Sequence, residues 1–254
     1  MNGKLYLVPN TLDFGVPGLD PAPDLQDVLP LGVIRTAARL THWVAENAKT
    51  TRAFLKRVDA VVPLAQALQS LQIVELPRAQ KGVKAAPATP LDSLLAAALQ
   101  GHDVGLISEA GLPAVADPGA ALVEAAHRMG IDVVPLSGPS SLLMALSVSG
   151  LNGQSFAFVG YLPVDAAARS ARIRELEALS RRYNQTQLMI ETPYRNQALM
   201  GALVSALSAT TRLSVSCGLT LPAGWTRSDS VSGWRLKPCP LPGDTPAVFG
   251  LLGV

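Results

Sequence analysis

Two segments of this chain gather the residue types that bind a small ligand. The first, SEAGLPAVADPG (108–119), follows the apolar run VGLI (104–107) and spends about ten residues on a connection that usually needs two to six. Its glycines let a ligand approach the main chain, and its prolines stiffen the path. The second, LSGPSS (136–141), brings hydroxyl groups to the start of another helical run. Both patterns predict exposed main-chain amides and hydroxyls at a binding site.

The first segment also has a purely structural interpretation. A surface Ω-loop or an extended helix cap has a similar composition, with Asp117 serving the amino end of the helix that starts near Ala120. The second segment favours the ligand-binding interpretation, because two such loops that follow neighbouring parallel strands form a crevice.

Histidine and cysteine chemistry is not indicated. His42 is expected at a strand edge, His102 in a turn and His127 on a helix, and none has a partner pattern, so we assign no catalytic histidine. Cys217 and Cys239 are the two cysteines, and neither has a paired spacing with a histidine. We therefore expect no metal site, no disulfide framework and a reducing compartment.

The first half of the chain alternates between short apolar runs and amphipathic ones. Strands separated by helices of about ten residues or more need crossover connections, which predict a largely parallel sheet covered on both faces. The expected strands are 4–9, 42–47, 73–77, 103–108 and 132–137, and the expected helices are 33–40, 50–58, 91–100, 120–129 and 140–150.

The second half has strands without helices between them, which predicts antiparallel pairing and a mixed sheet. Trp225 and Trp234 are expected in these strands, in core or dimer packing. With a boundary near Gly138, we predict an α/β protein with a parallel-sheet domain over 1–137 and a mixed-sheet domain over 138–254. The expected strands are 156–163, 186–191, 212–219, 229–236 and 247–253, with helices over 165–182 and 195–207.

Bulk composition narrows the class of protein. The chain has 254 residues, 48% of them hydrophobic and 16% charged, which is enough to bury a large core. Its net charge of +2 is too mild to indicate a nucleic-acid binder by itself. It has no run of eighteen apolar residues and no apolar stretch typical of a signal peptide at its start. We therefore expect a soluble cytoplasmic protein without a membrane segment.

Four ordered motifs carry a resemblance that spans most of the chain, and they are LISEAGLPAVADPG, VVPLSGPSSLLMALSVSGL, FVGYLP and ETPYR. Together they closely resemble the tetrapyrrole methylase superfamily. The nearest branch is similar to the bacterial enzymes that methylate a cytidine 2′-hydroxyl of 16S ribosomal RNA. The resemblance implies a two-domain α/β methyltransferase that uses S-adenosylmethionine, works as a homodimer and folds the cofactor into the cleft between its domains.

The resemblance also implies which residues bind the cofactor. A Gly-Asp-Pro or Gly-Thr-Pro element of the family is matched by Gly-Leu-Pro here, so the contacts implied at this element are main-chain contacts. A Thr-Ser element is matched by two serines, as partners for the carboxylate or amino group of the cofactor. The implied cofactor-binding residues are Gly111, Leu112, Pro113, Ala114, Val115, Ser140, Ser141, Met189 near the adenine, and Pro246 and Ala247 on the far side.

The sequence departs from the ribosomal branch after its second strand. That branch usually carries Glu-Asp-Thr-Arg, and this chain has Glu46, Asn47, Ala48 and Lys49. The glutamate is kept and one carboxylate is lost. By resemblance we assign Asn47 and Lys49 to substrate binding, and the lost carboxylate implies a change in activity or substrate if it orients the acceptor.

Methyl transfer from a sulfonium is an in-line displacement that needs alignment and desolvation, and neither a metal nor a covalent nucleophile. A ribose hydroxyl must still lose its proton, and Glu46 or Glu191 could accept it. Each of these glutamates also has an interpretation as a structural or binding residue. The helix over 165–182 carries Arg169 and Arg172, which could contact RNA phosphates or belong to a solvated face.

Three functions follow from these observations. The first is methylation of RNA, with ribosomal RNA or the small ribosomal subunit as partner. The second is methylation of a tetrapyrrole or another small molecule. The third is a protein that binds the cofactor without transferring the methyl group, which Leu112 and Asn47 suggest.

Overall fold

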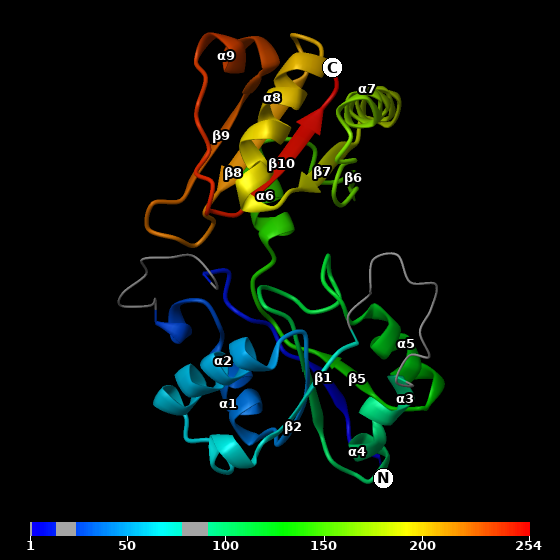
Figure 1. Cartoon of the computed structure of the whole chain (residues 1–254), viewed down its shortest axis with the longest axis vertical. Helices are drawn as coiled ribbons and strands as arrows, with labels where there is room; N and C mark the ends of the chain where they lie inside the picture. The colour runs from blue at the N-terminus through cyan, green and yellow to red at the C-terminus, as the bar shows by residue number, and fades with distance from the viewer. Residues whose placement is uncertain (1, 14–23, 78–90) are drawn as a thin grey trace. The chain divides into compact units, whose positions relative to one another are not determined.

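The computed structural model of the chain describes residues 2–13, 24–77 and 91–254. These residues form two compact units, and the border between the units lies between Pro139 and Ser140. Each unit is built around a five-stranded sheet (Figure 1). The segments 15–30 and 78–90, whose composition predicts irregular loops, fall wholly or partly outside the described residues.

The first unit contains a wholly parallel sheet, as predicted. Its strands follow the order β3-β2-β4-β1-β5, and every neighbouring pair is parallel. The strands are β1 (Leu5–Leu7), β2 (His42–Ala45), β3 (Gln72–Glu75), β4 (Val104–Ile107) and β5 (Val133–Pro135). Helices α1 (Leu31–Arg39) and α2 (Ala48–Val61) cover one face, and α3 (Leu91–Leu94), α4 (Ala96–Leu99) and α5 (Ala120–Arg128) cover the other (Figure 1).

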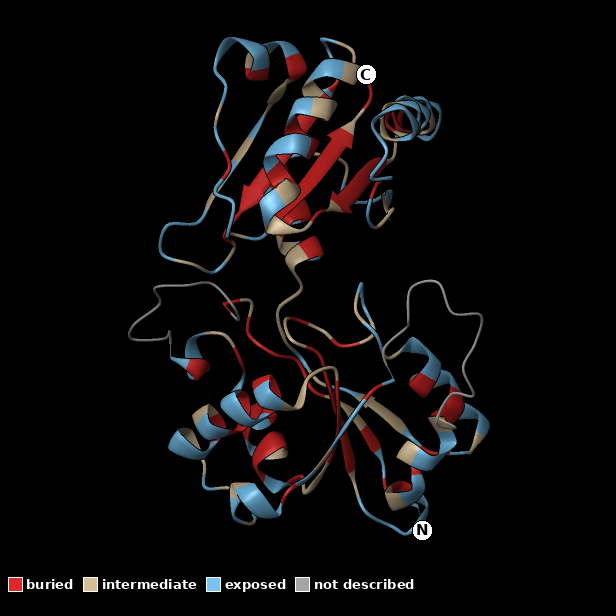
Figure 2. Ribbon diagram, in the orientation of Figure 1, coloured by how far each residue is buried: buried red, intermediate tan, exposed pale blue. Residues whose placement is uncertain are grey.

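Two apolar clusters hold this unit together, one on each face of the sheet. Trp43, Phe54 and Leu55 are fully buried on the side of α1 and α2, and Leu95 and Leu122 are fully buried on the other side. Figure 2 shows the buried strands between helices that are exposed on their outer sides.

A glycine in β4 makes room for the largest of these side chains. A Cβ atom at Gly105 would lie 2.7 Å from the ring of Trp43, which is closer than real Cβ contacts allow. Because Trp43 and Gly105 are paired directly across the two central strands, the indole ring packs over the glycine. Trp43 also donates a hydrogen bond from Nε1 to the carbonyl oxygen of Leu40, at 3.2 Å.

The predicted helix over 91–100 is two short helices rather than one. Leu95, between α3 and α4, has φ −99° and ψ 3°, which breaks the regular helical path. Its side chain is fully buried in the cluster under α5. The helix is therefore interrupted at a buried leucine, and the sequence pattern does not indicate this interruption.

The second unit contains a mixed sheet, as predicted, in the order β6-β7-β10-β8-β9. The β6–β7 pair is parallel and the other three pairs are antiparallel. The strands are β6 (Phe156–Phe158), β7 (Thr186–Ile190), β8 (Arg212–Cys217), β9 (Trp225–Ser230) and β10 (Ala247–Leu252). The helices are α6 (Ser141–Ser149), α7 (Ala166–Tyr183), α8 (Asn196–Ala206) and α9 (Val231–Leu236).

The two faces of this sheet are covered unequally. Side chains of α7, α8 and α9 pack against one face, around Met189, Val215 and Phe249. On the other face, α6 packs its buried side chains against Leu188 and Val248. The alternation of Leu188 with Met189 along β7 directs successive side chains to opposite faces.

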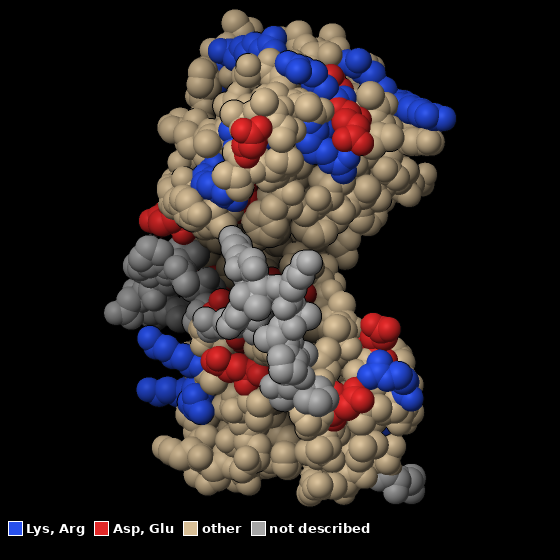
Figure 3. Space-filling model, turned by 45° about the vertical axis from the view of Figure 1, so that its right-hand side comes forward, with Lys and Arg blue, Asp and Glu red and all other residues tan. Residues whose placement is uncertain are grey.

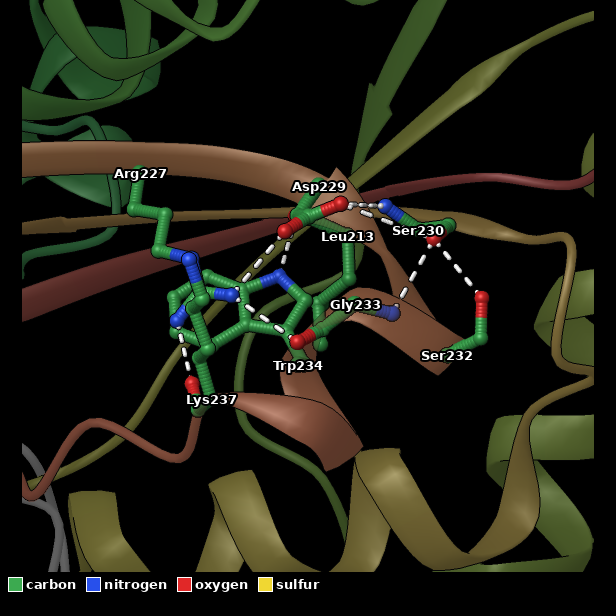
Figure 4. Close-up of polar contacts among 8 residues, drawn as sticks. All are labelled: Leu213, Arg227, Asp229, Ser230, Ser232, Gly233, Trp234 and Lys237. Atoms are coloured by element: carbon green, nitrogen blue, oxygen red, sulfur yellow. Dashed lines mark hydrogen bonds and ion pairs between the residues drawn. The ribbon is translucent and has the colours of Figure 1, made fainter.

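The predicted strand over 229–236 is wrong for most of its length. The strand β9 ends at Ser230, and Val231–Leu236 form the helix α9, so Trp234 lies on a helix. Ser230 caps the amino end, because its hydroxyl accepts a hydrogen bond from the amide of Gly233 at 3.1 Å (Figure 4). Trp234 is buried and donates from Nε1 to the carbonyl oxygen of Leu213 at 2.8 Å.

Arg227 of β9 fastens the other end of this helix. Its guanidinium donates hydrogen bonds to the carbonyl oxygens of Gly233 and Lys237, which are carbonyl groups at the carboxyl end of α9 (Figure 4). It also pairs with Asp229 at 2.9 Å and lies 4.1 Å from the ring centroid of Trp234. A cation at a helix carboxyl end is favourable, and this one comes from a neighbouring strand.

Candidate functional site

The carboxyl ends of four strands of the first unit meet at one edge of its sheet. Because β1, β2, β4 and β5 are parallel and lie side by side, the loops that follow them start at the same edge. These loops carry Asn10, Glu46, the segment 108–119 and the segment 136–139. The segment 108–119 and residues 136–139 of the second predicted loop therefore start at the same edge of the first unit.

Asn10 ties the loop after β1 to the loop after β4. Its side-chain amide donates to the carbonyl oxygens of Ser108, at 3.2 Å, and Glu109, at 3.0 Å. Its main-chain amide donates to the carbonyl oxygen of Gly111 at 2.9 Å. The Asn10 side chain is buried, so these bonds replace its contacts with water. Our sequence interpretation missed Asn10, although a polar residue just beyond a buried strand is a signal for such a role.

The loop after β4 holds a strained backbone. Gly111, Ala114 and Ala116 have φ values of +64°, +64° and +66°, and the two alanines adopt a conformation that costs a residue with a Cβ atom about 1 kcal/mol. A Cβ atom at Gly111 would lie 3.2 Å from Leu12 and 3.3 Å from the carbonyl oxygen of Pro139. Gly111 therefore permits close packing of three loops against one another, and strain of this kind is concentrated at binding sites.

Three carboxylates lie around this loop. Glu46 accepts a hydrogen bond from the amide of Glu109 at 2.9 Å, and both side chains are half-buried. Burial is the main reason that the pKa of Asp117 is raised to about 6, and the negative charges of Glu46 and Glu109 raise it further, against a hydrogen bond from Ser108. Asp117 does not cap the next helix, because α5 begins after Gly119 without a side-chain cap.

Asn47 has a clear structural role. Its side-chain oxygen accepts hydrogen bonds from the amides of Lys49, at 2.9 Å, and Thr50, at 3.4 Å, which makes it the amino cap of α2. Asparagine caps helices about as well as aspartate. The change from the aspartate of the ribosomal branch therefore keeps the cap and removes one negative charge, and the side chain of Lys49 is exposed beside it.

Glu191, the second predicted proton acceptor, is occupied by partners in the second unit. One carboxylate oxygen accepts from the amide of Thr192 at 2.8 Å, from its hydroxyl at 3.2 Å and from Arg195 at 2.6 Å. The Glu191 side chain is buried. These contacts fix the turn after β7, and they make Glu191 better suited to positioning than to proton transfer.

The remaining predicted cofactor residues fall into two groups. Ser140 and Ser141 start α6 and are half-buried, and the Ser140 hydroxyl makes no cap bond to the helix. Met189, Pro246 and Ala247 lie at one edge of the second sheet, where β7 ends and β10 begins. The Met189 side chain is fully buried in the core, whereas Pro246 is exposed and accepts a hydrogen bond from Gly218 at 2.9 Å.

The two predicted RNA-contacting arginines of α7 already have partners. Arg172 pairs with Glu175 at 2.7 Å, and Arg169 donates to the carbonyl oxygen of Val164 at 3.2 Å.

Among the described residues, no group of three or more His, Cys, Asp or Glu side chains is arranged to hold a metal ion. No helix in the described part of the chain has the length and apolar character needed to cross a membrane.

Comparison with known proteins gives one family. The sequence profile of the family described as Tetrapyrrole (Corrin/Porphyrin) Methylases matches residues 34–229. Ribosomal RNA small subunit methyltransferase I of Mesorhizobium japonicum is 42% identical over 127 residues, which cover 50% of this chain and 42% of that protein. The protein of the same name from Halalkalibacterium halodurans is 30% identical over 193 residues, which cover 76% of this chain and 56% of that protein.

Solved structures agree on the fold. The crystal structure of the methyltransferase CobJ superposes with a TM-score of 0.57 at 16% identity and covers 99% of this chain and 95% of that chain. Uroporphyrin-III-C-methyltransferase from Thermus thermophilus superposes with a TM-score of 0.51 at 20% identity, with 99% and 93% covered. The chain thus aligns with about half of the length of these two sequence relatives and with nearly the whole of the solved structures.

The raised pKa of Asp117 predicts a pH-dependent cost in stability. The folded state binds the proton of the Asp117 carboxyl more tightly than the unfolded state does. Protonation of Asp117 therefore stabilises the fold below pH 4, and this stabilisation is lost as the pH rises to about 6. We expect Asp117→Asn to raise the free energy of unfolding by about 1 kcal/mol above pH 6, after allowance for solvent screening. The gain should vanish near pH 4 in urea titrations.

Asp132→Asn is the matched control, because it makes the same chemical change at an exposed site on the opposite edge of the sheet. It should show no gain that grows between pH 4 and pH 6. An equal gain in both variants, or a gain for Asp117→Asn that does not change with pH, would contradict the assignment.

Proposed function

We propose, from the premise that this chain belongs to the tetrapyrrole (corrin/porphyrin) methylase family, that it transfers a methyl group from S-adenosylmethionine to ribosomal RNA. The observation that supports this proposal most directly is the strained loop 108–119, which has Glu46, Glu109 and Asp117 around it and forms the proposed site. The names of the two sequence relatives support ribosomal RNA of the small subunit as the acceptor.

The loop has the properties that this cofactor requires. The left-handed residues at 111, 114 and 116 turn the main chain repeatedly, and turns of this kind aim successive main-chain groups toward a ligand. The carboxylates favour a ligand with a positive charge, such as a sulfonium. In this proposal Gly111, Leu112, Pro113, Ala114 and Val115 line the cofactor through their main chain, and Ser140 and Ser141 offer hydroxyl groups. The assignments of Met189, Pro246 and Ala247 to the cofactor stay predictions.

When bound, S-adenosylmethionine supplies an activated methyl group, so the residues of the chain need only align the acceptor and take up its proton. Asp117 is the better proton acceptor, because a carboxylate whose pKa is near 6 is a stronger base than an ordinary one and is still ionised at neutral pH. Glu46 positions the loop through the amide of Glu109 and keeps a negative charge beside Asp117. Glu191 is assigned a positioning role at the turn after β7.

The proposal includes a homodimer, for which α6 offers an apolar surface. Leu143 is 52% exposed and Val148 is 55% exposed on a helix with no charged residue. Burial of such exposed apolar side chains against a second copy of the chain favours association.

The central prediction concerns methyl transfer. We expect label from S-adenosylmethionine to enter unmethylated small ribosomal subunits, and not porphyrinogens, with kcat/KM rising as the pH increases through about 6 because Asp117 of the free protein must be ionised. Asp117→Asn should lower kcat by about a hundredfold and abolish this rise, since general-base catalysis contributes that much. Asp132→Asn should change neither. Transfer to a porphyrinogen alone would favour the small-molecule function, and cofactor binding without transfer to either acceptor would favour a binding protein.

Cofactor affinity should depend on the packing at Gly111. In Gly111→Ala the new Cβ atom presses on Leu12 and on the carbonyl oxygen of Pro139, so the loop must shift. We expect calorimetry to show S-adenosylmethionine affinity lowered at least tenfold. Gly130→Ala is the control, because Gly130 has nearly the same φ, +67°, with nothing within 4 Å of the added atom. Equal affinities in the two variants would remove this loop from the cofactor site.

The homodimer predicts a mass of twice 26.6 kDa in light scattering at micromolar concentration. Leu143→Glu with Val148→Glu should give monomers, because charges cannot be buried unpaired in an apolar interface. Leu236→Glu, at a side chain that is 83% exposed on α9, should leave the dimer unchanged. A monomeric wild type would contradict this part of the proposal.

A further inference from the structure

Helix α2 carries a row of positive charges on its outer face. Lys49, Arg52 and Lys56 are exposed and are spaced three and four residues apart, so they lie along one side of the helix. The opposite side carries Phe54, Leu55 and other residues buried in the core. We call these three cations the α2 basic row. Lys and Arg side chains project from the edge of the first unit on which α1 and α2 lie (Figures 1 and 3).

No acid forms an ion pair with the α2 basic row in the described part of the chain, and the nearby Glu75 carboxylate accepts a hydrogen bond from the amide of Ala48 at 2.7 Å. Within the described ranges, none of its three side chains forms an ion pair, and Arg52 has a single long contact, to the carbonyl oxygen of Ala48 at 3.4 Å. Asp59, the acid on the same helix, instead accepts a hydrogen bond from the amide of Leu64 at 2.9 Å. A solvated helix face usually mixes both signs of charge, and the sequence from Lys49 to Lys56 has no acid.

Two of the five arginines of α7 differ in this respect. Arg172 pairs with Glu175, and Arg181 pairs with Glu177 and donates to the carbonyl oxygen of Val254. That helix therefore shows the mixture of charges that is typical of a solvated surface. The α2 basic row is the stronger candidate for an external anion.

The position of the row relates it to the candidate site. Helix α2 starts directly after Glu46 and Asn47 at the carboxyl end of β2, so Lys49 lies in its first turn. From Lys49 to Lys56 the row extends about 10 Å along the helix, at 1.5 Å per residue. The edge of the sheet where the loop after β4 begins carries Glu46 and Asp117, whose negative charges repel phosphate. A polyanion that reaches this edge is therefore favoured on the outer face of α2 and disfavoured at the loop.

We propose that the α2 basic row binds the phosphodiester backbone of the acceptor RNA, next to the nucleotide that reaches the carboxylates. This inference rests on the proposed function, because it takes RNA as the acceptor. Lysine and arginine neutralise phosphates and release counterions, so each contact adds to the salt dependence of binding. The row binds the backbone irrespective of base sequence, whereas the loop edge receives the uncharged ribose and base.

The test measures binding of 16S ribosomal RNA transcribed in vitro, at several KCl concentrations between about 50 and 200 mM. Arg52→Gln with Lys56→Gln removes two charges of the row. Because each lost phosphate contact on a single strand lowers the slope of log affinity against log salt by about 0.7, we expect a slope that is shallower by about 1.4. Affinity at the lowest salt concentration should fall on the order of tenfold or more.

Arg174→Gln with Arg182→Gln is the matched control, because it removes two charges from exposed positions of α7. It should keep the wild-type slope, and both variants should bind S-adenosylmethionine as the wild type does, which reports an intact fold. A wild-type slope in the α2 variant overturns the proposal, and a shallower slope in the α7 variant alone assigns the RNA to α7 instead.

Methyl transfer to small ribosomal subunits, measured in parallel, separates this proposal from the proposed function. If the wild type transfers the methyl group and the α2 variant keeps its slope, the row is wrong and the function stands. If the wild type binds RNA without any methyl transfer and the salt slope is shallower in the α2 variant, the α2 basic row is an RNA-binding surface and the proposed methyl transfer is wrong. If the wild type shows no salt-dependent binding of RNA, both are wrong.

Discussion

Asn10 donates both hydrogens of its side-chain amide to the loop that follows β4, and its main chain pairs with Gly111. These bonds hold the two segments together beyond the last residues of β1 and β4, through an antiparallel bridge next to a parallel pair of strands. Without them, the loop would be free to relax the left-handed conformations of Ala114 and Ala116. The form of the candidate site therefore depends on a buried asparagine that lies about a hundred residues earlier in the chain.

The loop after β4 brings together several features that lower the stability of the first unit. Two alanines with positive φ and the buried carboxylate of Asp117, beside the charges of Glu46 and Glu109, reduce the stability of the first unit, and the sheet and its two apolar clusters must compensate for them. Such a combination is expected where a ligand relieves the cost, because a positively charged ligand would stabilise the carboxylates and main-chain contacts would hold the turns. The arrangement thus stores at the site a free energy that binding can recover.

Much of the fold could be predicted from the sequence because its signals are local. Apolar runs such as VGLI and helices of ten residues between them identify the parallel sheet, and uninterrupted strands identify the mixed one. The helix α9 could not be predicted, because the alternating pattern DSVSGWRL fits a strand and the contacts of Arg227 that hold the helix come from tertiary structure. Asp117 enters the sequence interpretation only in the structural alternative, as a helix cap, because the causes of its raised pKa, which are burial and the charge of Glu46 far away in the chain, come from tertiary structure. Asn10 was missed because its partners are also distant.

The pairing of Trp43 with Gly105 limits how this protein can vary. The indole ring occupies the space that any side chain at position 105 would need, and both residues lie on central strands where the backbone cannot move aside. The two positions are therefore expected to covary. A relative with a larger residue in place of Gly105 must also have a smaller one in place of Trp43. Families that differ here should differ at both positions together, and a chimera that combines Trp43 with a larger residue at position 105 should be strongly destabilised.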